Sequence, residues 1–176
     1  MAKLAKVTML LSTVAMAGCM DLLSLHALST AQDRLFDPAI EGRWADDDAQ
    51  LLVERADDRY VATYQDKKDS SELIKYEVHL VDLGGVRLAD AIRKDGIVGH
   101  FFMRVRVTGG ELHLAFMDSD WLRGQVAHEE ADMDGGSKQA VLTMSTVELR
   151  KMVARFAREP KAYDTHEVVF RRPPVK

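Results

Sequence analysis

The sequence predicts a mainly β (α+β) protein, in which an antiparallel meander of about nine strands forms a barrel-like or strongly curved sheet. Three observations favour this fold class. Apolar and polar residues alternate over several short segments, pairs of turn-forming residues separate these segments, and most connections are too short for parallel crossovers. The chain has 176 residues, 47% hydrophobic and 30% charged, a composition typical of one globular domain.

The first 16 residues have the pattern of an export signal. Residues 1–6 hold two lysines and no acid, and residues 7–16 are apolar without a charge. An apolar helix needs about 20 residues to cross a bilayer, roughly twice the length available here. The pattern therefore predicts a signal peptide and not a transmembrane anchor.

The tetrapeptide Met16-Ala17-Gly18-Cys19 follows, and its cysteine is the only one in the chain. It resembles the lipobox of bacterial lipoproteins. The resemblance implies that Cys19 receives a diacylglycerol, that residues 1–18 are removed, and that the new amino group also takes an acyl chain such as palmitate. More than one acyl chain makes a membrane anchor stable. An ordinary secretory signal with a cysteine there by chance is the alternative interpretation.

The residues after Cys19 bear on location. Asp21 comes one position too late for the aspartate that retains lipoproteins in the inner membrane of enteric-type bacteria, so the resemblance implies the outer membrane and a body facing the periplasm. Removal of residues 1–18 leaves 22 basic and 28 acidic side chains, a net charge of −6. Because an anionic membrane does not attract such a body, we expect the anchor to be a tether and not the edge of a docking face.

We expect the mature chain to consist of a tether and one domain. Residues 19–41, the lipidated cysteine and the tether, show no strand period, and one short helix is expected near 21–34. Residues 42–176 have the pattern of a single β-rich globular domain without internal repeats.

Gly42-Arg43-Trp44 opens the first predicted strand of this domain, 42–45. It resembles the G-x-W signature of lipocalins, in which the tryptophan plugs one end of an eight-stranded barrel and the glycine admits its ring. The resemblance implies a lipocalin-like barrel that binds a hydrophobic or lipid-like ligand. A helix between strands departs from the lipocalin order, and an uncharacterised lipoprotein domain of similar β architecture is the other interpretation.

Three residue pairs predict hairpin turns, namely Asp57-Asp58, Gly84-Gly85 and Gly109-Gly110, because Gly and Asp tolerate the positive φ that two-residue turns need. A turn at the last pair places Val105 opposite Leu114 and leaves one face apolar and the other largely polar. A slip of one residue destroys this agreement.

The other two turns also give definite registers. The first places Leu51 opposite Tyr64, and the second places His79 opposite Asp90 and Val81 opposite Leu88. Both faces of the second pair hold apolar residues, so we expect it to be more deeply buried. Further strands are expected at 138–143 and 167–171.

Two short helices are expected, near 119–128 and 146–158. Asp118 or Ser119 is the predicted N-cap of the first. The second begins with a capping box, Ser145 to Glu148, and Pro160 follows its end. Its apolar stripe consists of Leu149, Met152, Val153 and Phe156. Its solvent-facing side carries Arg150, Lys151, Arg155 and Arg158.

No catalytic or metal-binding constellation is evident. The six histidines (His26, His79, His100, His113, His128 and His166) lack metal-ligand spacing, and the pair His100 and His113 is interpreted as a surface pair. The aspartates at 46–48, 118–120 and 132–134 lack the spacing of a calcium loop. We expect no metal, no cofactor beyond the lipids on Cys19, and no enzymatic activity, although an enzyme is not ruled out.

Two function classes remain. One is a membrane-anchored module that binds a hydrophobic small molecule inside the barrel. The other is an envelope accessory or inhibitor with a solid core, which contacts another protein through a strand edge or the basic side of the helix at 146–158. The excess of acidic residues gives no reason to expect nucleic acid as a partner.

Overall fold

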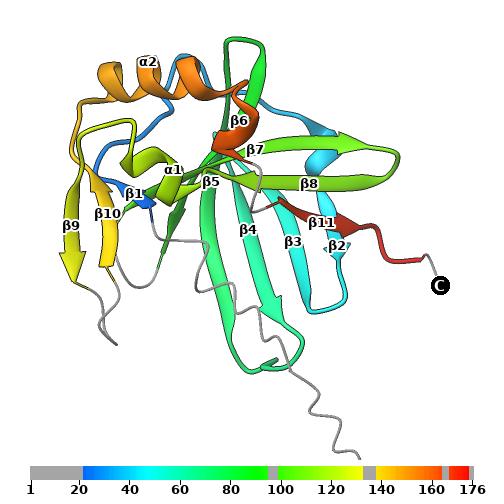
Figure 1. Ribbon diagram of the computed structural model, residues 1–176. Coiled ribbons are helices and arrows are strands. Elements are labelled where there is room, and N and C mark those ends of the chain that lie inside the picture. Colours follow the sequence, from blue (N-terminus) through cyan, green and yellow to red (C-terminus); the bar gives the residue numbers. More distant parts are fainter. Residues whose placement is uncertain (1–21, 95–98, 133–137, 164–166, 175–176) are drawn as a thin grey trace, which may run out of the picture.

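The computed structural model describes residues 22–94, 99–132, 138–163 and 167–174. Eight antiparallel strands close into a barrel (Figure 1), which confirms the predicted fold class. The barrel strands are β2 (Gly42–Ala45), β3 (Ala49–Ala56), β4 (Arg59–Asp66), β5 (Leu73–Leu83), β6 (Val86–Arg93), β7 (His100–Thr108), β8 (Glu111–Phe116) and β11 (Glu167–Arg171). They pair in chain order, β11 joins β8 to β2, and pairing of β6 with β7 completes the ring.

The three predicted hairpins are confirmed with their registers. Val105 pairs with Leu114, Leu51 with Tyr64, and His79 with Asp90. Both glycines of each glycine pair have positive φ, between 60° and 81°, whereas at the aspartate pair only Asp57 does, at 49°. These three turns lie at one end of the barrel, called the turn end. The longer connections after β2, β4 and β6 lie at the other, called the loop end.

Three further strands extend the sheet beside β7. β1 (Leu22–Ser24) lies parallel to β10 (Lys138–Leu142) and contacts β7, while β9 (Glu129–Asp132) pairs with the far side of β10. Neither β1 nor β9 was expected. The acidic sequence of β9 shows no apolar alternation, and β1 is too short to show a period.

The helix expected near 21–34 is wrong. The spacing of the leucines there is compatible with the apolar stripe of a helix. Leu22 and Leu23 nevertheless belong to β1, whose backbone groups pair with β7 and β10. Residues 22–40 also lie against the barrel along much of their length. Leu35 forms a β-bridge with Leu80, and the 3₁₀ helix η2 (Pro38–Ile40) covers the turn end. Most of the segment expected to be a tether is therefore part of the folded body.

Both predicted helices are present and shorter than expected. α1 (Ser119–Arg123) begins at the predicted N-cap Asp118, whose side chain accepts from Trp121 N at 2.8 Å, and it ends at Gly124. α2 (Thr146–Phe156) has the predicted capping box and buries the predicted apolar stripe. A 3₁₀ helix, η3 (Pro160–Ala162), precedes β11.

Two apolar clusters lie on opposite sides of the barrel wall. Leu80 and Ala89 face the interior, whereas Val81 and Leu88 face outward into a second cluster with α1, α2, β10 and η3. This arrangement confirms that the β5–β6 pair is buried on both faces. None of the helices within the described residues is long and apolar enough to span a bilayer.

Candidate binding site inside the barrel

The barrel encloses a cavity of about 300 Å³. Seven of the eight barrel strands contribute side chains to its wall, and nearly all of these are apolar, for example Val53, Ala91, Phe101 and Leu114. Alternation along each strand directs these residues inward and their neighbours outward. The interior is thus an apolar chamber and not a fully packed core.

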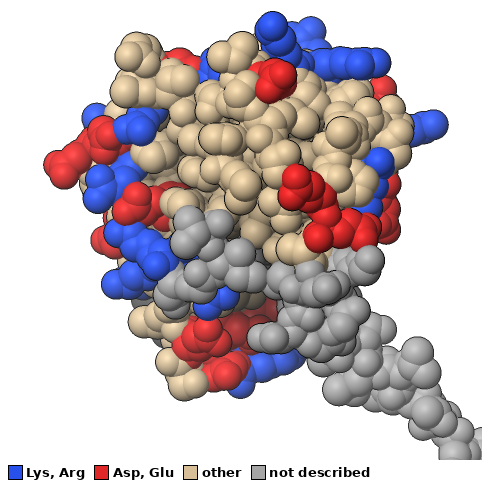
Figure 2. Space-filling model, turned by 90° about the vertical axis from the view of Figure 1, so that its left-hand side faces the viewer, with Lys and Arg blue, Asp and Glu red and all other residues tan. Residues whose placement is uncertain are grey.

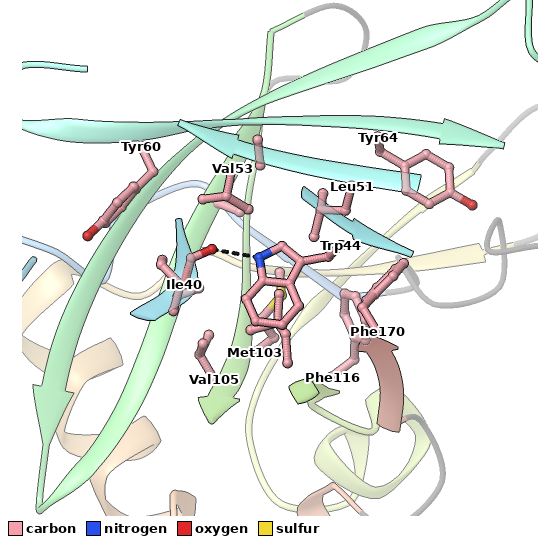
Figure 3. Packing of buried hydrophobic residues seen from close by; sticks show 14 of the residues in the cluster. Ile40, Trp44, Leu51, Val53, Tyr60, Tyr64, Met103, Val105, Phe116 and Phe170 are labelled. Atoms are coloured by element: carbon pink, nitrogen blue, oxygen red, sulfur yellow. Dashed lines mark hydrogen bonds between the residues drawn. The ribbon is translucent and has the colours of Figure 1, made fainter. Parts of the chain in front are cut away.

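The turn end of the chamber is closed by residues around the predicted G-x-W motif. Trp44 is buried and donates from Nε1 to the carbonyl of Ile40 at 2.8 Å, as Figure 3 shows. Ile40 lines the cavity. The Tyr60 hydroxyl fixes the chain just before η2, because it accepts from Asp37 N at 2.8 Å.

Gly42 serves the motif differently from the expectation. It has a φ of +111°, and a Cβ there would lie 2.7 Å from Arg172 Nη1. The Arg172 guanidinium lies 4.2 Å from the centre of the Trp44 ring and donates to the carbonyls of Glu41 and Ala39, both at 3.1 Å. The glycine therefore admits the arginine that covers the indole, and not the indole itself. Arg172 is not predictable from the sequence pattern, because its one signal is its position directly after the last strand.

Among the described residues that line the cavity, the charged ones lie toward the loop end. Arg93 Nη2 lies 3.3 Å from Glu72 Oε1, and both residues contribute to the cavity wall. Tyr64 and Tyr76 lie in the same region of the wall. Burial raises the pKa of Tyr64, and the Asp66 carboxylate raises it further, so the phenol stays neutral at physiological pH. The site therefore combines a long apolar chamber with a few polar groups at one end.

The histidines lie in different parts of the structure and bond to different partners. His100 Nδ1 lies 2.7 Å from Asp90 Oδ1, and the other Asp90 oxygen accepts from Ser29 N at 2.9 Å. Asp90 thus bonds to His100 although it lies opposite His79 in the register. Burial lowers the pKa of His79, and Arg34 lowers it further.

His113 belongs to a different cluster from His100. It lies 3.5 Å from both Glu111 and Glu167, and its strand partner Arg106 is six positions along β7 from His100, about 20 Å away. His128 Nδ1 lies 3.2 Å from the Val126 carbonyl. His166 lies outside the described residues.

The aspartate clusters are used in turns and caps. Asp46 Oδ1 accepts from Asp48 N at 2.9 Å and from Ala49 N at 2.6 Å. Asp118 caps α1, while Asp120 pairs with Arg123 at 2.7 Å. The pair at 132 and 134 falls outside the side chains that the structure describes. Among the described residues, no group of three or more His, Cys, Asp or Glu side chains is arranged to hold a metal ion.

Two of the four basic residues predicted for the helix at 146–158 contact other parts of the molecule. Arg150 pairs with Asp33 and donates to the Leu28 carbonyl at 2.8 Å. Arg158 donates to the Gly84 carbonyl at 2.5 Å, and the Arg155 guanidinium lies 5.0 Å from the ring of Phe156. The contacts of Arg150 and Arg158 hold α2 and the residues after it against the rest of the molecule, so two of the four charges that suggested a partner surface have a structural role.

Comparison with protein-family models, curated proteins and solved structures gives no match. The barrel is compatible with a lipocalin-like binder, and this statement rests on the architecture and the cavity alone.

Proposed function

We propose that the protein is a non-enzymatic lipoprotein of the cell envelope, anchored through lipids on Cys19 in the outer membrane and facing the periplasm, whose barrel binds a hydrophobic or lipid-like ligand. The apolar cavity carries the ligand part of the proposal. The lipobox-like tetrapeptide and the apolar segment before it support the anchor.

The size and the apolar lining of the chamber favour a bound ligand. Side chains fill the interior of many small barrels, whereas others hold one small ligand. A cavity of about 300 Å³ favours the second kind here. Apolar wall that stays in contact with water lacks the roughly 25 cal/mol per Å² that its burial contributes, so a hydrophobic ligand that covers the wall of the chamber stabilises the protein. The volume lies near the lower bound for small-molecule sites.

A cavity-filling variant tests the ligand. Ala91 lines the chamber and is 1% exposed, so Ala91→Leu adds apolar volume inside. Ala154→Leu, on an exposed position of α2, makes the same chemical change outside. Native mass spectrometry of protein from membranes should detect a lipid-like adduct on the wild type and Ala154→Leu, and less on Ala91→Leu. A delipidated wild type that takes up no hydrophobic probe refutes ligand binding.

The anchor is tested separately. Cys19→Ser should move the protein from the membrane fraction to the soluble fraction and remove the mass of the acyl groups from the N-terminal peptide. Unchanged fractionation together with unchanged processing contradicts the anchor and leaves the cavity result untouched.

A further inference from the structure

We propose that the protein rests on its membrane through one defined surface, the face beside β1. This anchor-side face consists of residues 25–27, which follow β1, and residues 143–147, which are the connection after β10 and the first two residues of α2. The inference rests on the proposed lipidation of Cys19 and adds which part of the body contacts lipid. It reverses the expectation, drawn from net charge alone, of a free tether.

The length of chain between anchor and fold restricts the orientation. Leu22 and Leu23 are 8% and 5% exposed, and β1 is paired with strands on both sides. Two residues separate Cys19 from Leu22, so the lipidated residue lies within about 11 Å of the first residue of β1, and residues 25–27 follow the other end of this short strand, roughly 10 Å further on. A body of this size is about 40 Å across. The membrane surface must therefore pass close to β1, and the far side of the barrel cannot reach it.

Exposed apolar side chains lie on this face. Leu25 is 57% exposed and Val147 is 62% exposed, the two largest values among the large hydrophobic residues that the structure describes. Leu25 N donates to the Leu142 carbonyl at 3.0 Å, and Thr146 Oγ1 donates to the Ala27 carbonyl at 3.0 Å. These bonds hold the two segments side by side, and each segment carries one exposed apolar side chain.

The distribution of charge also suits a lipid surface. Figure 2 views the molecule from the side where β1, β9, β10 and the start of α2 lie in Figure 1. Uncharged residues cover much of the upper and central part of this view, a few acidic groups lie among them, and most of the other charged side chains lie around them. Such a surface avoids the desolvation of charged groups and weakens repulsion between a body of net charge −6 and anionic lipids.

Three single-cysteine labels test the orientation in the full lipidated protein. Thr143→Cys lies on the anchor-side face, Ser70→Cys at the loop end and Thr108→Cys at the turn end, and all three positions are exposed. Acylation blocks Cys19, so each variant carries one free thiol. In phosphatidylethanolamine–phosphatidylglycerol vesicles that contain a nitroxide-labelled lipid, a fluorophore at position 143 should be quenched several-fold more than one at position 70 or 108.

Charge substitutions then test the apolar contact. Leu25→Asp with Val147→Asp should lower quenching at position 143 to the level of the other two labels. Leu73→Asp is the matched control, because Leu73 is 53% exposed and lies at the start of β5, at the loop end. It should leave the quenching pattern unchanged. Thermal unfolding of all variants checks that these exposed substitutions leave the fold intact.

The outcomes separate the orientation from the anchor. If the protein floats with vesicles and carries its acyl groups, but the three labels are quenched equally or position 70 or 108 more strongly, the orientation is refuted and the anchor stands. If label 143 is shielded from iodide in envelopes but not in vesicles, another protein covers the face and the proposal fails. Absence of flotation overturns both the anchor and this inference.

Discussion

Two buried tyrosines, Tyr163 and Tyr60, should respond in opposite directions when the hydroxyl is removed. Tyr163 is 2% exposed, and its hydroxyl has no hydrogen-bond partner within the described part of the chain. The Arg104 guanidinium packs on its ring, 4.0 Å from the centre, and phenylalanine keeps that contact. Leaving a buried polar group unpaired costs about 1–3 kcal/mol, so Tyr163→Phe should stabilise the protein by about 1–2 kcal/mol.

Tyr60→Phe makes the same chemical change and should have the opposite effect. The Tyr60 hydroxyl accepts from Asp37 N at 2.8 Å and lies 3.2 Å from the Asp37 carbonyl, so its removal leaves a backbone donor without this partner. We expect a loss of about 1–2 kcal/mol in the free energy of unfolding. Urea denaturation at constant m-value measures both. If the two substitutions shift stability in the same direction, the assignment of the Tyr163 hydroxyl as unpaired is wrong.

Three further predictions concern pH, backbone and burial. Burial raises the pKa of Tyr163 to about 12, so the folded protein favours the protonated phenol; stability is complete below pH 10 and falls by up to about 2–3 kcal/mol between pH 10 and 12, and Tyr163→Phe should flatten that decline in alkaline urea titrations. Gly42→Ala should destabilise more than Gly109→Ala in thermal melts, because the φ of +111° at Gly42 lies outside the left-handed region that φ +60° at Gly109 occupies, and a Cβ at Gly42 displaces the Arg172 guanidinium; equal losses contradict this. Asp90→Ala should lower the free energy of unfolding by about 2–4 kcal/mol, since two donors lose a buried acceptor, whereas Asp120→Ala, at a side chain 88% exposed, should cost well under 1 kcal/mol.

The sequence predicted most of the barrel because hairpin turns are local. A glycine pair between alternating segments determines which residues face each other, so the register of Val105 with Leu114 needed no knowledge of the rest of the fold. The capping box of α2 is local for the same reason.

Features that depend on distant parts of the chain were missed. β1 is a strand only because β7 and β10 leave a gap that it fills, and its three residues have no pattern of their own. The cavity is likewise invisible in the sequence, because Ala62, Ala89 and Ala91 line a chamber only when strands from the whole barrel surround them. Arg172 meets Trp44 across more than half the chain. Volume and closure are properties of the assembled barrel.

The pairing of β1 with β10 has a consequence for the order of folding. Leu22 and its partner Ala140 lie more than a hundred positions apart, whereas most barrel strands pair with their immediate neighbours in the chain. Contacts of such long sequence separation form late, since closing a large loop is entropically unfavourable until the intervening chain is ordered. We therefore expect β1 to dock late in folding, after β7 and β10 have formed the edges between which it lies.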